Sequence, residues 1–159
     1  MEARRLKPAA LVFAAVLCAV AALAEAVAAG RGIRARFQEL VFPRYSIPLA
    51  IWPIVGVLYY VMCFIVAYRL FDRGDGAARD TALALLVAVM GLNAAWNYFF
   101  FRARSVGRSF LISVPYSFLA VVLFALVWRV DRVAAIPVAI YLAYLVYANL
   151  WGYKLWRLN

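Results

Sequence analysis

Five long apolar runs constrain this chain more than any other feature of its sequence. They cover residues 8–29, 47–68, 81–101, 109–128 and 133–153. The first run is rich in Ala and Val and carries one acid, Glu25, whereas the other four contain no charged residue. About 20 apolar residues, at a rise of about 1.5 Å each, cross the hydrocarbon core of a bilayer. Because a backbone in lipid must satisfy its own hydrogen bonds, and a barrel strand needs only about half this length, we predict five transmembrane helices.

The composition excludes a soluble globular protein. Of the 159 residues, 69% are hydrophobic and 15% are charged, against about 45–50% and about 25% in soluble domains. We therefore predict an all-α protein with one membrane domain over residues 1–159, a multi-pass integral bundle of five helices. Only the first loop, residues 30–46, is long. Its Phe and Tyr side chains predict that it folds back over one end of the bundle.

Charge and reactive residues narrow the function. The net charge is +10, but the basic residues form short clusters between the apolar runs, which indicates contact with lipid headgroups and not with nucleic acid. Eight basic residues on one side and nine on the other leave the orientation undecided. The chain has no His, and Cys18 and Cys63 lie in separate apolar runs, so we expect neither a metal site nor a disulfide. Without paired carboxylates or an activated Ser, we predict no catalytic residue and no enzyme.

The first run has a second interpretation. An N-terminal cluster of basic residues, followed by an apolar run and by Ala-Leu-Ala at positions 22–24, is also typical of a secretory signal with a cleavage site. The apolar run continues past that site to Ala29, so we expect a retained first helix. Cleavage would leave four spans.

Aromatic residues gather on three of the five spans. In the fifth span, Tyr141, Tyr144 and Trp151 recur at helical spacing and share one helix face. The second span offers Trp52, Tyr59, Tyr60 and Phe64, and the third Trp96, Tyr98, Phe99, Phe100 and Phe101. We expect these rings to line a cavity for a flat hydrophobic ligand. The alternative is ordinary packing and interfacial aromatic belts.

Two amides of the third run and one acid of the first run are candidate polar contacts between helices. Asn93 and Asn97 are one turn apart and must face a neighbouring helix or a wet cavity, because an unpaired amide in lipid is costly. Glu25 is the only acid that could lie within the membrane. Its place in the last turn and a half of its helix predicts that it reaches the interface, so we do not assign it to the site.

Small residues and prolines complete the pattern of the spans. Small residues one turn apart in the third run permit close helix approach and predict a homodimer through this helix. These pairs are Ala84 with Ala88 and Gly91 with Ala95. Pro53, Pro115 and Pro137 fall within the runs, and we expect each to kink or interrupt its helix.

Two motifs resemble those of a known family. Residues 91–100 read Gly-Leu-Asn-Ala-Ala-Trp-Asn-Tyr-Phe-Phe, and residues 156–159 read Trp-Arg-Leu-Asn. Both are similar to signatures of the tryptophan-rich sensory protein family, the bacterial relatives of the mitochondrial translocator protein or peripheral benzodiazepine receptor. The Pro-rich approach to the second span at 42–48 and the Tyr-Leu-Ala-Tyr at 141–144 are similar to further family motifs. The resemblance covers about residues 37–159, and it implies a multi-pass protein of a bacterial-type membrane.

The resemblance also implies a binding site. In the family, an often dimeric five-helix bundle encloses a cavity for porphyrins, sterol-like lipids or synthetic isoquinoline and benzodiazepine ligands, and the long first loop covers it. Matched position by position, Asn93 and Trp96 would line the cavity, Tyr45 and Pro48 would lie near the lid, and Tyr144 would form part of the wall. Family tryptophan or asparagine positions are replaced here at Ala50, Gly56, Tyr144 and Gly152. The porphyrin breakdown ascribed to the family depends on such tryptophans, so we do not expect it here.

The leading hypothesis is a non-enzymatic membrane receptor or transporter-like protein that binds a flat hydrophobic ligand, such as porphyrin, haem or a sterol-like lipid, with no covalently held cofactor. Its expected ligand-binding residues are Asn93, Trp96, Tyr144, Tyr45, Pro48, Phe100 and Tyr60. Rings would stack on the ligand, and Arg34, Arg36 and Arg44 would meet its carboxylates. The alternative is a structural subunit of a larger membrane complex that has lost the pocket. A membrane-embedded enzyme acting on lipid or pigment would need an acid in a polar cavity, and Glu25 is the only candidate.

Overall fold

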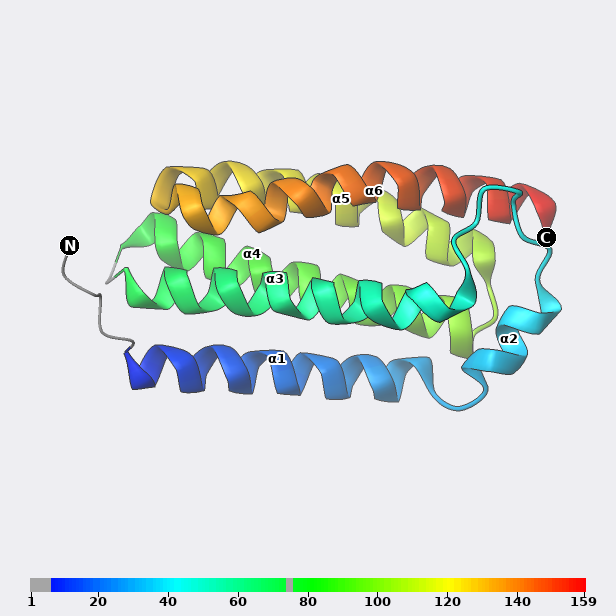
Figure 1. Ribbon diagram of the computed structural model, residues 1–159, viewed down its shortest axis with the longest axis horizontal. Coiled ribbons are helices and arrows are strands. Elements are labelled where there is room, and N and C mark those ends of the chain that lie inside the picture. Colours follow the sequence, from blue (N-terminus) through cyan, green and yellow to red (C-terminus); the bar gives the residue numbers. More distant parts are fainter. Residues whose placement is uncertain (1–6, 74–75) are drawn as a thin grey trace.

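Five long helices lie side by side in the computed structural model, which describes residues 7–73 and 76–159 (Figure 1). They are α1 (Pro8–Ala29), α3 (Trp52–Asp72), α4 (Ala77–Asn97), α5 (Val106–Val130) and α6 (Arg132–Leu158). Each is long and apolar enough to cross a membrane. The prediction of an all-α, five-helix membrane bundle is therefore confirmed. Of the predicted N-terminal basic cluster, Arg4 and Arg5 lie outside the described residues.

The helix boundaries show where the three prolines of the spans lie. A short 3-10 turn, η1 (Leu49–Ile51), leads into α3, and Pro53 lies in the first turn of that helix. The N–H of a first-turn residue has no intrahelical acceptor in any case, so proline costs little there. The prediction that Pro53 interrupts its helix is wrong. Pro115 lies inside α5 and Pro137 inside α6, and both helices continue past their prolines, so neither proline ends its helix.

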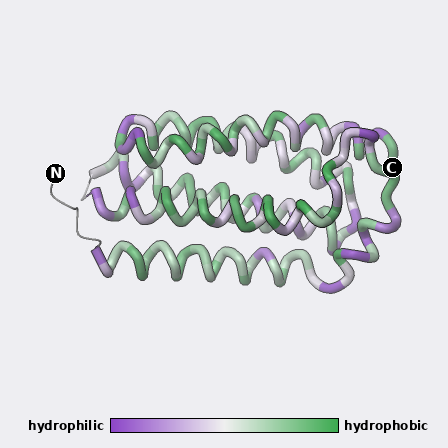
Figure 2. The backbone as a smooth tube through the Cα atoms, viewed as in Figure 1, coloured by the Kyte–Doolittle hydropathy of each residue, from purple (hydrophilic) through white to green (hydrophobic). Residues whose placement is uncertain are grey.

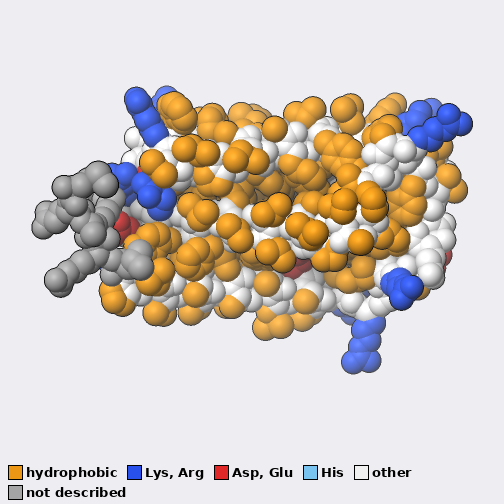
Figure 3. All heavy atoms as spheres, in the orientation of Figure 1, with side chains coloured by type: hydrophobic (Ala, Val, Ile, Leu, Met, Phe, Trp, Pro, Cys, Tyr) orange, Lys and Arg blue, Asp and Glu red, His pale blue; other side chains and the backbone are white. Residues whose placement is uncertain are grey.

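The outer surface of the bundle is apolar. Figure 3 shows hydrophobic side chains over the lateral face in view, with Lys and Arg at its two ends, and Figure 2 shows the same division along the backbone. On α1, large side chains that are more than half exposed include Val12, Val16, Val20, Leu23 and Val27. In a soluble protein an exposed apolar surface of this size would be a liability, whereas lipid solvates it. The chain is an integral, multi-pass membrane protein.

α1 lies at the periphery of the bundle. It packs against α3 and α4, and only Ala10, Ala14 and Ala29 are fully buried along its length. Small side chains allow the helices to approach closely, which is how helices pack in lipid. α1 therefore depends on a few specific contacts to hold it in place, including the stacked rings of Phe13 and Phe71, whose centroids are 4.4 Å apart.

The segment over residues 30–48, termed the lid, covers one end of the bundle and contains the short helix α2 (Ile33–Glu39) (Figure 1). The buried Arg36 fastens it. Its Nε donates to the carbonyl of Phe100 at 3.3 Å, its Nη2 donates to the carbonyl of Arg104 at 3.0 Å, and its Nη1 bonds to Glu39. Sequence reasoning expected Arg36 to meet a ligand carboxylate, but its guanidinium holds the lid to the chain beyond α4.

The lid is also fastened to α6. The side-chain amide of Asn159 accepts from the N–H of Val41 at 2.9 Å and donates to its carbonyl at 3.0 Å. Trp151 donates its indole N–H to the hydroxyl of Ser46 at 2.9 Å, and the hydroxyl of Tyr147 accepts from the backbone of Ile47. The terminal Asn of the Trp-Arg-Leu-Asn motif therefore has a structural role that the motif alone did not reveal.

The opposite end of the bundle is held by a buried carboxylate. Asp131 caps α6 by accepting from the N–H groups of Val133 and Ala134, and it accepts from Arg69 at 2.9 and 3.0 Å and from Arg73 at 2.8 Å. Burial alone would raise the pKa of Asp131, but these hydrogen bonds outweigh burial and hold the pKa well below its usual range. The Asp131 carboxylate is thus held in its ionised form at the junction between α3, α5 and α6.

We expect Asp131→Asn to lower the free energy of unfolding at pH 7 by about 1–3 kcal/mol, because the amide loses charge-assisted hydrogen bonds from two arginines. The measurement is a denaturant titration in detergent micelles. Because the pKa of the carboxyl is lowered by folding, its stabilising effect is complete above the unfolded pKa of about 3.9 and is lost as the pH falls below that value. The difference in free energy of unfolding between the parent and Asp131→Asn should therefore become smaller below about pH 4.

The matched control is Asp80→Asn, which makes the same change of charge. Asp80 is exposed and forms an ion pair with the adjacent Arg79, so its replacement should alter the free energy by no more than about 0.5 kcal/mol. Equal losses from the two variants would show that Asp131 contributes no more than any surface acid.

Candidate functional site

Three helices converge on the carboxylate of Glu25, near the lid end of α1. The hydroxyl of Tyr60 on α3 donates to Glu25 Oε2 at 2.7 Å. On α4, Asn93 Nδ2 donates to the same oxygen at 2.7 Å, and Asn97 Nδ2 donates to Oε1 at 3.0 Å. The i, i+4 spacing of the two asparagines places both amides on one face of α4. These four residues, termed the Glu25 cluster, form a polar contact between helices that are otherwise apolar.

The prediction that Glu25 reaches the interface is wrong. Its side chain turns inward to α3 and α4, because three hydrogen-bond donors there satisfy a carboxylate that lipid cannot solvate. All three donors are neutral, and within residues 7–73 and 76–159 no Lys or Arg forms an ion pair with Glu25. The cluster thus supplies Glu25 with hydrogen bonds but with no basic partner among the described residues.

Eight rings form an aromatic cluster at the lid end of the bundle. They are Phe37 and Phe42 of the lid, Trp52 of α3, Trp96 of α4, Phe100 and Phe101 of the following turn, and Tyr147 and Trp151 of α6. Trp96 stacks on Phe100 with 4.7 Å between centroids and 10° between planes. The ring centroids of Trp52 and Trp151 are 4.8 Å apart. The indole N–H of Trp52 is buried and has no hydrogen-bond partner among the described residues, so the cluster holds an unused donor.

A π-helical turn, η2 (Tyr98–Arg102), follows α4 and positions the stacked pair. The N–H of Ala103 bonds to the carbonyl of Tyr98 at 2.8 Å, five residues earlier. The wider turn leaves the carbonyl of Phe100 as the acceptor for Arg36 of the lid. π turns are rare and occur often at functional sites. Here the turn links the aromatic cluster directly to the lid.

Tyr144 lies apart from Asn93 and Trp96, in a row of tyrosines along α6. Its ring centroid is 5.8 Å from that of Tyr141 and 6.2 Å from that of Tyr147, which in turn lies 6.5 Å from Tyr45. Tyr45 is 51% exposed and donates its hydroxyl to the carbonyl of Leu150. Pro48 is exposed, and its carbonyl accepts from the N–H of Ile51, the last residue of η1.

The structure therefore divides the predicted site residues into groups. Asn93 and Tyr60 meet at Glu25, and Trp96 stacks on Phe100. Tyr144 belongs to the row of tyrosines on α6, and Tyr45 of the lid contacts the last tyrosine of that row, Tyr147. Pro48 directly precedes η1, the turn that leads into α3. Glu25 was not assigned to the site from the sequence, and Trp52 and Trp151, although among the rings expected to line a cavity, were not among the expected ligand-binding residues. The signal for Glu25 was present, because it is the single acid within the five apolar runs and two amides one turn apart were available to receive it.

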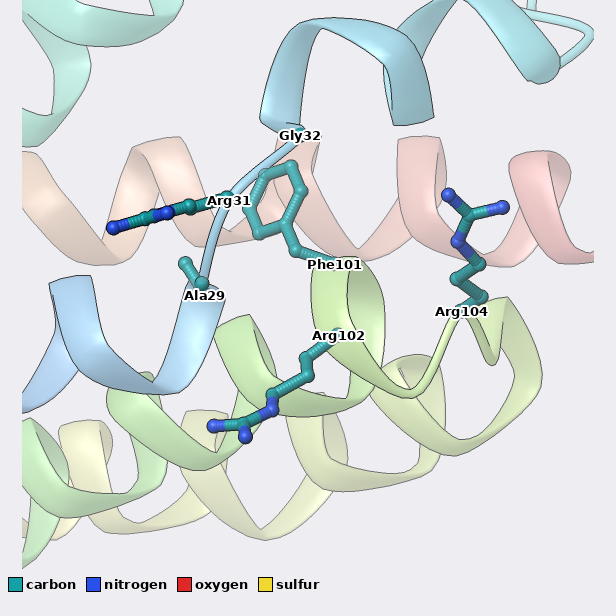
Figure 4. Close-up of a pocket in the computed structure, with 7 residues that line it drawn as sticks. Ala29, Arg31, Gly32, Phe101, Arg102 and Arg104 are labelled. Atoms are coloured by element: carbon teal, nitrogen blue, oxygen red, sulfur yellow. The ribbon is translucent and has the colours of Figure 1, made fainter.

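Two pockets border the lid. One of about 400 Å³ is lined by Arg31, Arg102 and Arg104 together with Phe101, Ala29, Gly30 and Gly32. Figure 4 shows Arg31 and Arg102 extending to one side of this pocket and Arg104 standing apart on the other, so the guanidinium groups do not converge on one point. The other, of about 530 Å³, lies between α2 and the C-terminal end of α6. Neither is lined by Asn93, Trp96 or Tyr144.

Comparisons with known proteins agree with this architecture. The model of the TspO/MBR family matches residues 12–157. The Translocator protein of Ovis aries is 32% identical over 110 residues, which make up 67% of this chain and 64% of that protein. The chain thus spans just under two thirds of the length of this curated relative.

The Glu25 cluster predicts a specific coupling between Tyr60 and Glu25. Tyr60→Phe removes one hydroxyl from a charged acceptor, and we expect it to lower the free energy of unfolding by about 1–2 kcal/mol in detergent. In a Glu25→Leu background the same change should cost almost nothing, because the acceptor is gone. Tyr98→Phe, at an exposed position on η2, is the control and should be neutral. Additive losses from Tyr60→Phe and Glu25→Leu would contradict the coupling.

Proposed function

Because the chain belongs to the TspO/MBR family, we propose that it is a receptor or transporter for a flat hydrophobic ligand, bound between the helices beneath the lid. Family membership supports the general role of a membrane receptor or transporter-like protein. The class of ligand is our proposal. Porphyrins, haem and sterol-like lipids have the required shape, with a rigid apolar body and few polar atoms.

The observation that carries the proposal is the aromatic cluster. Rings from the lid and from three of the membrane helices meet at one end of the bundle, and one indole donor among them, that of Trp52, is buried without a partner among residues 7–73 and 76–159. An apolar site with one or two convergent polar groups is typical of sites for small hydrophobic molecules. A flat ligand that replaced one ring of the Trp96–Phe100 stack would keep the stacking contact and could offer Trp52 an acceptor.

The lid supplies the route to this site. Phe37 and Phe42 belong to the lid and to the aromatic cluster at once, so movement of the lid would uncover Trp52 and Phe100. Arg34 and Arg44 of the lid are exposed and remain available to meet an acidic group of a ligand at the membrane surface, whereas Arg36 is held by Phe100, Arg104 and Glu39.

A second candidate function is a structural subunit of a larger membrane complex. The close packing of the aromatic cluster favours it, since Trp96 and Phe100 stack on each other and neither pocket at the lid is lined by Trp96. Under this alternative the protein would bind no small hydrophobic ligand and would purify with a stoichiometric partner. The two candidates thus differ in a directly measurable property.

Titration with protoporphyrin in detergent micelles tests the proposal. We expect saturable binding, followed by the shift of the porphyrin absorption band and by quenching of tryptophan emission. Trp96→Leu should weaken binding by about tenfold, because a stacked aromatic contact contributes about 0.5–1.5 kcal/mol beyond burial.

Trp128→Leu is the matched control for this titration. Trp128 is an exposed tryptophan at the end of α5 that lies away from the lid, so its replacement should leave the affinity unchanged. Absence of saturable binding by the parent, for protoporphyrin and for a sterol alike, would contradict the proposal and favour the structural subunit.

A further inference from the structure

The Glu25 cluster holds an acidic side chain inside the bundle, with no basic residue paired to it in the part of the chain that the structure describes. The parts of α1, α3 and α4 that surround it, residues 8–29, 52–68 and 81–97, contain no Lys or Arg. An ionisable residue at such a position is costly to keep and usually marks a functional site. Three neutral donors make the charged form tolerable, but a cation would stabilise it further.

The carboxylate also has capacity for one more donor. A carboxylate can accept about four hydrogen bonds, and Glu25 accepts two at Oε2 and one at Oε1. Its side chain is only partly buried, so Oε1 remains within reach of a group that enters between the helices.

The Glu25 cluster adjoins the aromatic cluster along α4. Asn93, Trp96 and Asn97 follow the i, i+3, i+4 pattern and share one helix face, and Phe100 stacks on Trp96. A ligand whose ring lies on Trp96 would therefore direct one edge toward Asn93 and Glu25. The polar character of Glu25 then determines which chemical group that edge can carry.

We infer that Glu25 selects ligands with a protonated amine on the edge that faces α1 and α4. The inference rests on the proposed function for the flat body of the ligand and adds the class of its polar group. An ammonium group would donate to Glu25 Oε1 and neutralise the carboxylate in a medium of low dielectric constant, where such a pair is strong. A carboxylate at the same edge would be repelled, and a hydroxyl would gain a hydrogen bond but no charge pairing.

Three pyrene derivatives with the same ring system test the inference at neutral pH: pyrenemethylamine as the cation, pyrenemethanol as the neutral form and pyrenecarboxylate as the anion. Binding to the full chain in zwitterionic micelles is followed by energy transfer from tryptophan to pyrene. The amine should bind about tenfold more tightly than the alcohol, and the anion more weakly than both. In Glu25→Gln the preference of the amine over the alcohol should disappear while the alcohol still binds.

Asp80→Asn is the control, because it changes the net charge equally at the opposite end of α4 from Asn97 and should preserve the preference for the amine. If the parent binds all three probes equally, or if Glu25→Gln keeps the preference, the amine inference is overturned while the proposed function stands. If the parent binds none of the three and no porphyrin, the proposed function itself fails. A variant that loses affinity for the alcohol and the amine in equal proportion would assign Glu25 to structure alone.

Discussion

The absence of water in the hydrocarbon core is the constraint on which this structure depends. Every polar group within a span must find a partner in the protein, so the few polar side chains in the spans specify which helices are neighbours. Glu25 joins α1 to α3 and α4. A second set joins α5 to α6, where Asn149 accepts from Ser113 and donates to Ser117. Apolar packing alone would leave these choices open, because lipid tails solvate an apolar helix face as well as a neighbouring helix does.

The two ends of the bundle are held together by different kinds of contact. At the N-terminal end of α1, the buried Asp131 ties α3 and α6 together through two arginines. At the other end, the lid is held by separate contacts, among them Arg36 to Phe100 and Asn159 to Val41. Each of these contacts can break individually without exposing a buried acid. Under the proposed function, the lid end is the end that would open to admit a ligand.

The tryptophans missing from the family pattern can be compared with those that form the aromatic cluster. Ala50 and Gly56 stand where the resemblance leads one to expect tryptophan, and no heavy atom lies within 4 Å of a Cβ built on Gly56. Trp52 and Trp151 are present instead and lie against each other beneath the lid. Aromatic side chains are thus present at the lid end of the bundle, although the α3 residue that contributes one of them differs from the positions expected from the resemblance. Glu25 adds a charge to this region, which gives the site a polarity that aromatic residues alone could not supply.

The sequence by itself determined the five spans, the folded-back first loop and the family, because runs of about 20 apolar residues have one stable conformation in lipid and the Asn93, Trp96 and Phe100 signature is local. The sequence also identified Asn93 and Asn97, the two amides that donate to Glu25, as side chains that must face a neighbouring helix or a wet cavity. Only the tertiary structure decided that Glu25 faces inward, since a residue one turn from a helix end can reach either the interface or a neighbour, and the choice depends on donors that lie 35 and 68 positions away. The same holds for Arg36, Trp52 and Asn159, whose partners come from distant parts of the chain. Spacing along one helix assigns a face, but which element that face meets depends on how the five helices pack.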